Sequence, residues 1–256
     1  MFRDKGPKWW AALVLVALVV IAGGWLAVDR LVGGEGQPTA APTPPETAEV
    51  PSTPSAPSGE CDLPEPDGDG VLGEHAPEAD SWQSAGSAVY TVPYPVSREF
   101  GPGVVRDGVR SCFQRSQAGA LFAATNYVAQ MAQFEKLPSW LPSVLAGPGR
   151  DGIVQLVLDN ESVLTGGDTT GLEAARNNWI AYKLLQWDEA EGRAMVDVVL
   201  DQVTSSGQTY LSTVFDLRWI DGDWRIWMPS ADSMYVGSTV PLQQLTGMGY
   251  RSWREE

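Results

Sequence analysis

Aspartate and tyrosine side chains between residues 127 and 216 are the residues best suited to chemistry. A carboxylate base beside a tyrosine hydrogen-bond donor, at the mouth of an apolar cavity, can move a proton on a bound substrate. The aspartates fall in alternating, strand-like runs, where carboxylates on the polar face are ordinarily solvated. We therefore expect them to be structural and predict that the chain is not an enzyme. The candidates are three aspartates and three tyrosines: Asp197, Asp201, Asp216, Tyr127, Tyr182 and Tyr210.

The sequence offers even fewer candidates for nucleophilic catalysis or metal binding. The only histidine, His75, lies in a stretch rich in Pro, Gly and Asp, and the sequence has no Gly-rich phosphate loop or nucleophile elbow. The run Asp67–Gly70 weakly resembles a calcium loop, but Leu72 stands where such a loop requires glycine. We predict no metal and no cofactor.

The N-terminal part of the chain contains twenty consecutive uncharged residues, Trp9–Val28. A helix of that length is about 30 Å long, which matches the hydrocarbon core of a bilayer. Arg3, Lys5 and Lys8 precede it, so the positive-inside rule places residues 1–8 in the cytoplasm and the rest of the chain outside. We predict a single-pass signal-anchor.

A cleaved signal peptide is the alternative interpretation of the same region. Signal peptides have apolar cores of about 7 to 15 residues that end in a small-residue site. Here the run is longer, and the small residues Gly23 and Gly24 are followed by the bulky Trp25. The length and the flanks favour the uncleaved anchor.

Residues 29–58 have the composition of a disordered, Pro-rich stalk. Between residues 33 and 58 there are seven prolines and three glutamates, and no Lys, Arg or aromatic residue. Such a segment cannot bury enough apolar surface to offset the entropy cost of ordering. We expect it to hold a folded domain away from the membrane.

The remaining residues, 59–256, are enough for one hydrophobic core. They divide into an irregular lead-in at 59–97, with scattered strand, and a folded domain at 98–256. The whole part carries 27 acidic against 13 basic residues, because five acidic and four basic residues precede it. An acidic surface repels nucleic acid phosphates, so we expect no direct nucleic acid partner.

The only two cysteines, Cys61 and Cys112, both fall on the predicted exported side of the membrane. Oxidation is permitted there, so the two are the candidate disulfide. A bond between them closes a loop of about 50 residues, worth about 4 kcal/mol in the chain-entropy model. Two unpaired thiols remain the alternative, because two cysteines form no spacing pattern.

Helical periodicity precedes strand periodicity in the folded part. Helices come first and short turns join the strands that follow, which is typical of an α+β domain with helices packed on one sheet face. Leu121, Val128, Phe215 and Leu217 should be buried between helix and sheet, with Asp216 and Arg218 pointing away. The first helix is expected at 117–135, with Ser116 as its N-cap and with Leu137 and Pro138 ending it. Further helices are expected at 139–146 and 151–164, and strands at 179–187, 194–204, 209–220 and 223–228.

This order of elements, ending in a hairpin with DGDWRIW, resembles the nuclear-transport-factor-2-like (cystatin-like) roll, in which helices pack on a curved antiparallel sheet. The segment GPGVVRDGVRSCFQRSQAGALFAATNY, residues 101–127, is similar to a recurring segment of actinobacterial membrane-anchored proteins. Cys112 stands where that segment usually has glycine. The layout of tail, single span, stalk and roll is similar to the inner-membrane scaffold subunit of type IV secretion and Gram-positive conjugation machines.

The resemblance implies a membrane-tethered extracytoplasmic assembly or scaffold module of a conjugation or secretion apparatus. Its partners would be the membrane, through residues 9–28, other envelope or transfer-machine proteins, and a further copy of itself. A cell-envelope ligand-binding accessory and an isomerase-like enzyme are the alternatives. We expect the working surface on the outer sheet face or on the segment with Tyr235, Tyr250 and Trp253. Five tryptophans are expected in core and sheet packing: Trp179, Trp187, Trp219, Trp224 and Trp227.

Overall fold

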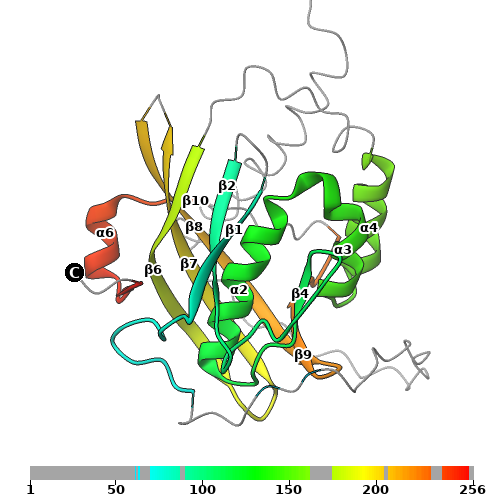
Figure 1. Cartoon of the computed structure of the whole chain (residues 1–256), viewed down its shortest axis with the longest axis horizontal. Coiled ribbons are helices and arrows are strands. Elements are labelled where there is room, and N and C mark those ends of the chain that lie inside the picture. Colours follow the sequence, from blue (N-terminus) through cyan, green and yellow to red (C-terminus); the bar gives the residue numbers. More distant parts are fainter. Residues whose placement is uncertain are drawn as a thin grey trace, which may run out of the picture.

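The computed structural model combines α-helices with a large β-sheet (Figure 1). It describes residues 61, 63, 70–86, 90–161, 175–204, 207–231 and 238–253. The helices are α2 (Gln117–Met131), η1 (Phe134–Lys136, a 3-10 turn), α3 (Leu137–Val144), α4 (Arg150–Asp159) and α6 (Leu242–Gly247). The strands are β1 (Ser81–Gly86), β2 (Tyr90–Val96), β3 (Val104–Arg106), β4 (Val109–Ser111), β5 (Leu145–Ala146), β6 (Ala175–Asp188), β7 (Arg193–Thr204), β8 (Gly207–Ile220), β9 (Asp223–Trp227), β10 (Ser238–Thr239) and β11 (Arg251–Ser252).

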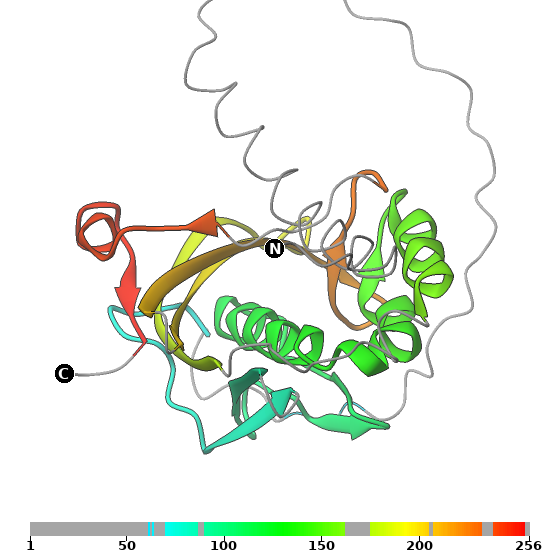
Figure 2. The same cartoon turned by 90° about the horizontal axis from the view of Figure 1, so that it is seen from above.

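The main sheet has the strand order β1-β2-β6-β7-β8-β9-β5. Its centre, β6 to β9, is an antiparallel meander, as the alternating sequence of these strands predicts. Two short parallel pairings extend the sheet on either side, β2 with β6 and β5 with β9. Figure 2 shows the sheet curving around α2, so that β1 and β2 lie on the opposite side of this helix from β7 and β8.

Helix α2 is the centre of the fold. Ser116 caps it as predicted, because its Oγ accepts a hydrogen bond from the Gly119 N–H at 3.0 Å. Every residue from Ala118 to Gln130 is buried, which a helix achieves only when it is covered on all sides. The concave face is the side of the curved sheet that faces α2. Leu121 and Val128 of α2 are buried against this face, and Phe215 and Leu217 of β8 are buried on it. The predicted helix-to-sheet packing is confirmed.

The boundaries of the helices differ from those predicted. The first helix ends at Met131 rather than at Glu135, and the second begins at Leu137 rather than at Ser139. Pro138 therefore lies in the first turn of α3, where a proline needs no hydrogen-bond partner, instead of ending the preceding helix. The third helix, α4, ends at Asp159, and the part of its predicted range beyond residue 161 lies outside the described residues.

The stretch before residue 98 is more ordered than predicted. It contains β1 and β2, which form an antiparallel hairpin with register Ser81 to Val96. β2 then joins β6 at Tyr90 and Thr91. The predicted division between an irregular lead-in and a domain at residue 98 is therefore wrong, because the hairpin is part of the main sheet. Its signal was hidden by Pro93 and Pro95, which argue against a strand in a sequence.

The last described residues, 238–253, form a segment that we call the C-terminal strap. β10 pairs with the edge of β8 at Ser212 and Leu211, and β11 pairs with the edge of β6 at Tyr182 and Ala181. Helix α6 lies between these two pairings, so the strap runs from one strand edge to the other across the convex face (Figures 1 and 2).

The predicted tail, membrane span and stalk, residues 1–58, lie outside the described residues. Within the described ranges, no helix has the length and apolarity needed to cross a bilayer.

Candidate functional site

The structure does not bring the predicted acid–base residues together. Tyr182 pairs with Val198 and is fully buried on the concave side of the sheet. Asp197 is the residue before Val198 on β7 and pairs with Lys183. Its side chain lies on the convex side of the sheet, which faces away from α2. Successive side chains of a strand point to opposite faces, so a one-residue offset separates the two groups by the thickness of the sheet.

The space between α2 and the sheet is filled by large side chains. Phe113, Tyr127, Phe215 and Trp224 are all at most 1% exposed there. The Tyr127 hydroxyl donates to the Trp224 carbonyl oxygen at 2.5 Å, and burial raises the pKa of Tyr127 well above its usual range. Tyr127 is thus a buried neutral side chain with its proton committed to the backbone, which is a structural arrangement rather than a catalytic one.

The convex face carries a separate polar cluster beneath the C-terminal strap. Asp197, which is 4% exposed, accepts hydrogen bonds from the Ser212 Oγ at 2.7 Å and from the Tyr250 hydroxyl at 2.5 Å. Beside it, the Lys183 Nζ donates to the Met248 carbonyl oxygen at 2.5 Å. Partial burial, together with the bond to Asp197, raises the pKa of Tyr250 to about 12. The cluster fastens the strap to the sheet.

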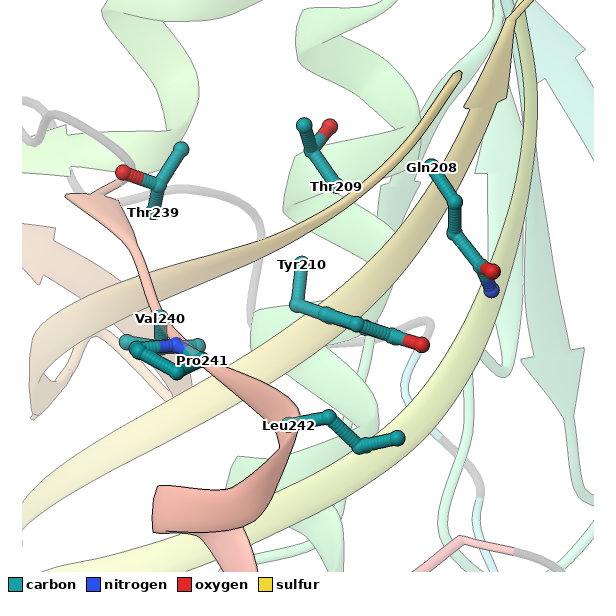
Figure 3. Close-up of a pocket in the computed structure, with 7 residues that line it drawn as sticks. All are labelled: Gln208, Thr209, Tyr210, Thr239, Val240, Pro241 and Leu242. Carbon is teal, nitrogen blue, oxygen red and sulfur yellow. The ribbon is translucent and has the colours of Figure 1, made fainter.

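Next to this cluster, a shallow open groove of about 420 Å³ lies between β8 and the strap (Figure 3). The side chains of Tyr210 and Leu242 project to the same side of it. Tyr210 is the only one of the six acid–base candidates in its lining, which combines apolar and amide or hydroxyl groups. Such a lining can bind a small or extended ligand but offers no general base. The lining residues are Gln208, Thr209, Tyr210, Thr239, Val240, Pro241 and Leu242.

Beyond the strap, the convex face carries three arginines in one row. Arg193, Arg218 and Arg225 are direct neighbours across β7, β8 and β9. Asp216 accepts from Arg193 Nε at 3.0 Å and Nη2 at 2.9 Å, and from Arg218 Nε at 3.3 Å. Arg225 donates to the Ser143 carbonyl oxygen at the end of α3. Asp216 and Arg218 thus point away from the core as predicted, and their role is charge pairing.

The last predicted acid, Asp201, also has a structural role. It accepts from the Gln208 amide at 2.8 Å across the β7–β8 hairpin. The described residues contain no group of three or more His, Cys, Asp or Glu side chains that could hold a metal ion. Most of the calcium-loop-like run at Asp67–Gly70 lies outside them.

The chain matches the model of one protein family over residues 40–250, a family described as a domain of unknown function (DUF8175). The chain belongs to this family. No curated protein and no solved structure matches it. The family range includes the two cysteines, the groove and the arginine row, but its description assigns no activity to them.

Cys61 and Cys112, both in the family range, are joined by a disulfide, with their α-carbons 5.2 Å apart. Cys112 has a φ of +66°, a left-handed conformation that glycine adopts most readily. Position 112 therefore has a backbone conformation that favours glycine. Here a cysteine occupies it and ties residue 61 to the body of the fold.

Asp223, also in the family range, was not singled out by its sequence. It is 5% exposed, and its carboxylate accepts from the backbone N–H groups of Cys112 at 2.9 Å, Phe113 at 3.0 Å and Trp224 at 2.9 Å. Burial raises the pKa of Asp223 above its usual value. The three N–H groups and the positive charge of Arg225 stabilise the carboxylate and so partly offset this rise. Residues 111 positions apart meet here, and no local pattern in the sequence signals such a contact.

The tryptophans divide between the two faces. Trp179 and Trp224 are buried in the core, and Trp187 and Trp219 pack against it, as predicted. Trp227 instead lies beneath the Arg218 guanidinium, 5.0 Å from it, on the convex side.

The aromatic segment expected to be exposed is not a free surface. Trp253 is 6% exposed and packs against Trp82, Trp179 and Tyr182, with ring centroids about 6 Å apart, and Tyr250 is half-buried. Tyr235 lies outside the described residues.

Proposed function

We propose that the chain is a membrane-tethered extracytoplasmic assembly module of a conjugation or secretion apparatus, which acts through its surface and not through an internal cavity. The observation that carries this proposal is the contrast between a filled interior and an exterior with a groove, an arginine row and an open strand edge. Scaffolds need rigid bodies with several contact surfaces, and this arrangement supplies them.

The disulfide supports the extracytoplasmic part of the proposal. Disulfides persist in oxidising compartments and are rare in the bacterial cytosol. The Cys61–Cys112 bond lies just after the predicted anchor and stalk, at the start of the described fold. A cytoplasmic N terminus, the span at 9–28 and an exported disulfide-bonded domain form one consistent topology.

We further propose that the fold is a nuclear-transport-factor-2-like roll. Helices followed by a curved antiparallel meander, with α2 across the concave face, support this assignment. The β1–β2 hairpin precedes the helices and lies on the other side of α2. In this chain the hairpin covers α2 on the side away from β7 and β8.

The proposal is tested in the source bacterium by deleting the gene and measuring conjugative DNA transfer or secretion. We expect transfer to fall by at least tenfold and to be restored by the full chain, but not by a version without residues 1–58. Native electrophoresis of membranes solubilised in mild detergent should show the full chain in complexes well above 27.6 kDa. Normal transfer in the deletion strain would overturn the proposal.

The groove favours one second candidate, a cell-envelope ligand-binding accessory. Native mass spectrometry of the full chain purified from its own membranes tests it. A bound small molecule that disappears in Tyr210→Ala, while Gln155→Ala on α4 retains it, would favour this candidate over assembly.

A further inference from the structure

The two edges of the main sheet are built differently. At one edge, β5 has only two residues and follows α3 directly. The Ser143 carbonyl oxygen of α3 accepts a hydrogen bond from the Arg225 guanidinium. At the other edge, β1 has six residues, five of them exposed, and pairs on one side only, with β2. Within the described residues, no strand pairs with its outer side.

Two prolines in β2 show which backbone groups of β1 face outward. Pro93 pairs with Ser84 and Pro95 pairs with Trp82. The Pro93 carbonyl accepts from Trp179 Nε1 at 2.7 Å, and the Pro95 carbonyl accepts from Asn126 Nδ2 at 3.0 Å, so both point away from β1. These are therefore the non-hydrogen-bonded pairs of the antiparallel ladder, in which the N–H and C=O groups of both residues point outward. The backbone groups of Trp82 and Ser84 lie at the open edge.

Three features that commonly prevent strand pairing are missing from β1. Edge strands are commonly protected by charged side chains, by proline or by a bulge. Between Asp80 and Arg98 the chain has no charged residue, and β1 itself, SWQSAG, has no proline and pairs with β2 in an unbroken register. Trp82, at its start, is 46% exposed.

We propose that this edge pairs with the same edge of a second copy of the chain, as an antiparallel β1–β1 contact about a two-fold axis. This inference rests on the proposed assembly function and names one of its partners. Such an edge is self-complementary. When two identical strands run in opposite directions, the outward N–H groups of each copy face the outward C=O groups of the other.

Charge favours a second copy at this place. Residues 59–256 carry 14 more acidic than basic residues, so two copies repel one another over most of their surfaces. Two neutral β1 strands approach without bringing carboxylates together. Tethering to one membrane adds to this, since it keeps the domains at a common height and raises their effective concentration.

The test measures the mass of the full chain in detergent micelles across a concentration series, by sedimentation velocity. We expect a dimer for the wild type. In Ser84→Lys, a charge at the open edge should raise the dimer dissociation constant at least tenfold. Gln155→Lys, which adds the same charge on exposed α4, is the matched control and should leave it unchanged. Circular dichroism and the retained Cys61–Cys112 bond verify that each variant is folded.

A second measurement does not depend on the lysine variant. Ser84→Cys in native membranes should give a covalent dimer with a short bifunctional maleimide, and Gln155→Cys should give none. A monomeric wild type, or a dimer that Ser84→Lys leaves intact, overturns the inference. If the wild type is monomeric and Ser84→Lys instead weakens co-purification with another envelope protein, the edge takes a foreign strand and the second copy is excluded.

The two proposals fail separately. A chain that still forms large envelope complexes without self-association loses only the β1–β1 contact. A chain that dimerises through β1 while its deletion leaves transfer normal loses only the proposed function.

Discussion

The two faces of the β6–β9 meander have opposite constructions. The concave face packs against α2 in one continuous cluster that includes Trp179, Trp224 and Tyr127. Among the described residues, the convex face has one small apolar cluster beneath the C-terminal strap, Ala181, Val199 and Leu245, with the buried polar pair Asp197 and Ser212 beside it. Stability should therefore depend on the concave face, whereas the convex face is free to carry contacts with other molecules.

The two faces also differ in the hydrogen-bond partners of their buried polar side chains. On the concave side, Tyr127 and Trp224 bond to backbone carbonyls. On the convex side, Asp197 is satisfied by the hydroxyls of Ser212 and Tyr250. Side-chain partners can be lost when the strap moves, while backbone partners on packed elements persist.

The largest expected effect comes from Trp224→Ala on the concave face. It removes a fully buried indole and its hydrogen bond to the Gln114 carbonyl, so we expect the free energy of unfolding to fall by about 5 kcal/mol. Trp227→Ala, the same change three residues along on the convex side, should cost less than half as much. Urea unfolding of the full chain in detergent measures both, and equal losses would contradict the division between the faces.

Removing the disulfide should have the next largest effect. Cys61→Ala with Cys112→Ala opens a loop with a sequence separation of 51 residues, which costs about 4 kcal/mol in the chain-entropy model. Cys61→Ala with Cys112→Gly should cost about 1 kcal/mol less, because glycine adopts the positive φ of residue 112 without strain. The comparison is made by urea unfolding without reductant. A greater loss in the glycine variant would contradict the backbone argument.

Leu245→Ala should destabilise the convex face alone. Leu245 is the strap residue in the small convex cluster, so we expect a loss of about 2 kcal/mol, at the lower end for a buried leucine. Hydrogen exchange should accelerate at the Trp253 amide, which bonds to the Ile180 carbonyl. The amides of α2 should be unaffected, and faster exchange there would show that the two faces unfold together.

The smallest expected effect is that of Tyr250→Phe, which removes one hydroxyl from Asp197. We expect a loss of about 1 kcal/mol, confined to the strap. The pKa of Tyr250 is raised to about 12, so its contribution is complete below the ordinary tyrosine value and is lost as pH rises from about 10 through 12.

In the wild type, the amides of the strap should become less protected against hydrogen exchange as pH rises from about 10 to 12. In Tyr250→Phe this decrease should be smaller, because the variant has no Tyr250 hydroxyl to ionise. Tyr90, Tyr127 and Tyr182 also have raised pKa values and titrate in both proteins, so the difference between the two isolates Tyr250. An identical alkaline profile in the variant would exclude this role.

Local patterns were enough to predict the centre of the fold. Alternation in β6 to β9, the Ser116 cap and the apolar stripe with Leu121 and Val128 all act over a few residues, and the structure confirms each. The β1–β2 hairpin was missed because Pro93 and Pro95 break the usual strand signal. They are accommodated because their missing N–H groups face away from β1, a position that only the pairing register reveals.

By itself, the sequence determined the central helices, apart from their exact ends, the strands β6 to β9, and which side chains of these strands share a face. It also determined that the chain has a long apolar run, an acidic domain and two cysteines. These properties depend on local backbone preference, on side-chain alternation and on composition.

Only the tertiary structure decided which residues meet. It placed Asp197 and Tyr182 on opposite faces of the sheet, joined Asp223 to the backbone of Cys112 and aligned three arginines across neighbouring strands. Among the described residues, it also left the outer side of β1 without a paired strand. Each of these depends on register and on contacts between residues far apart in the chain. A shift of one residue in strand register would reverse every face, and no local sequence pattern carries that information.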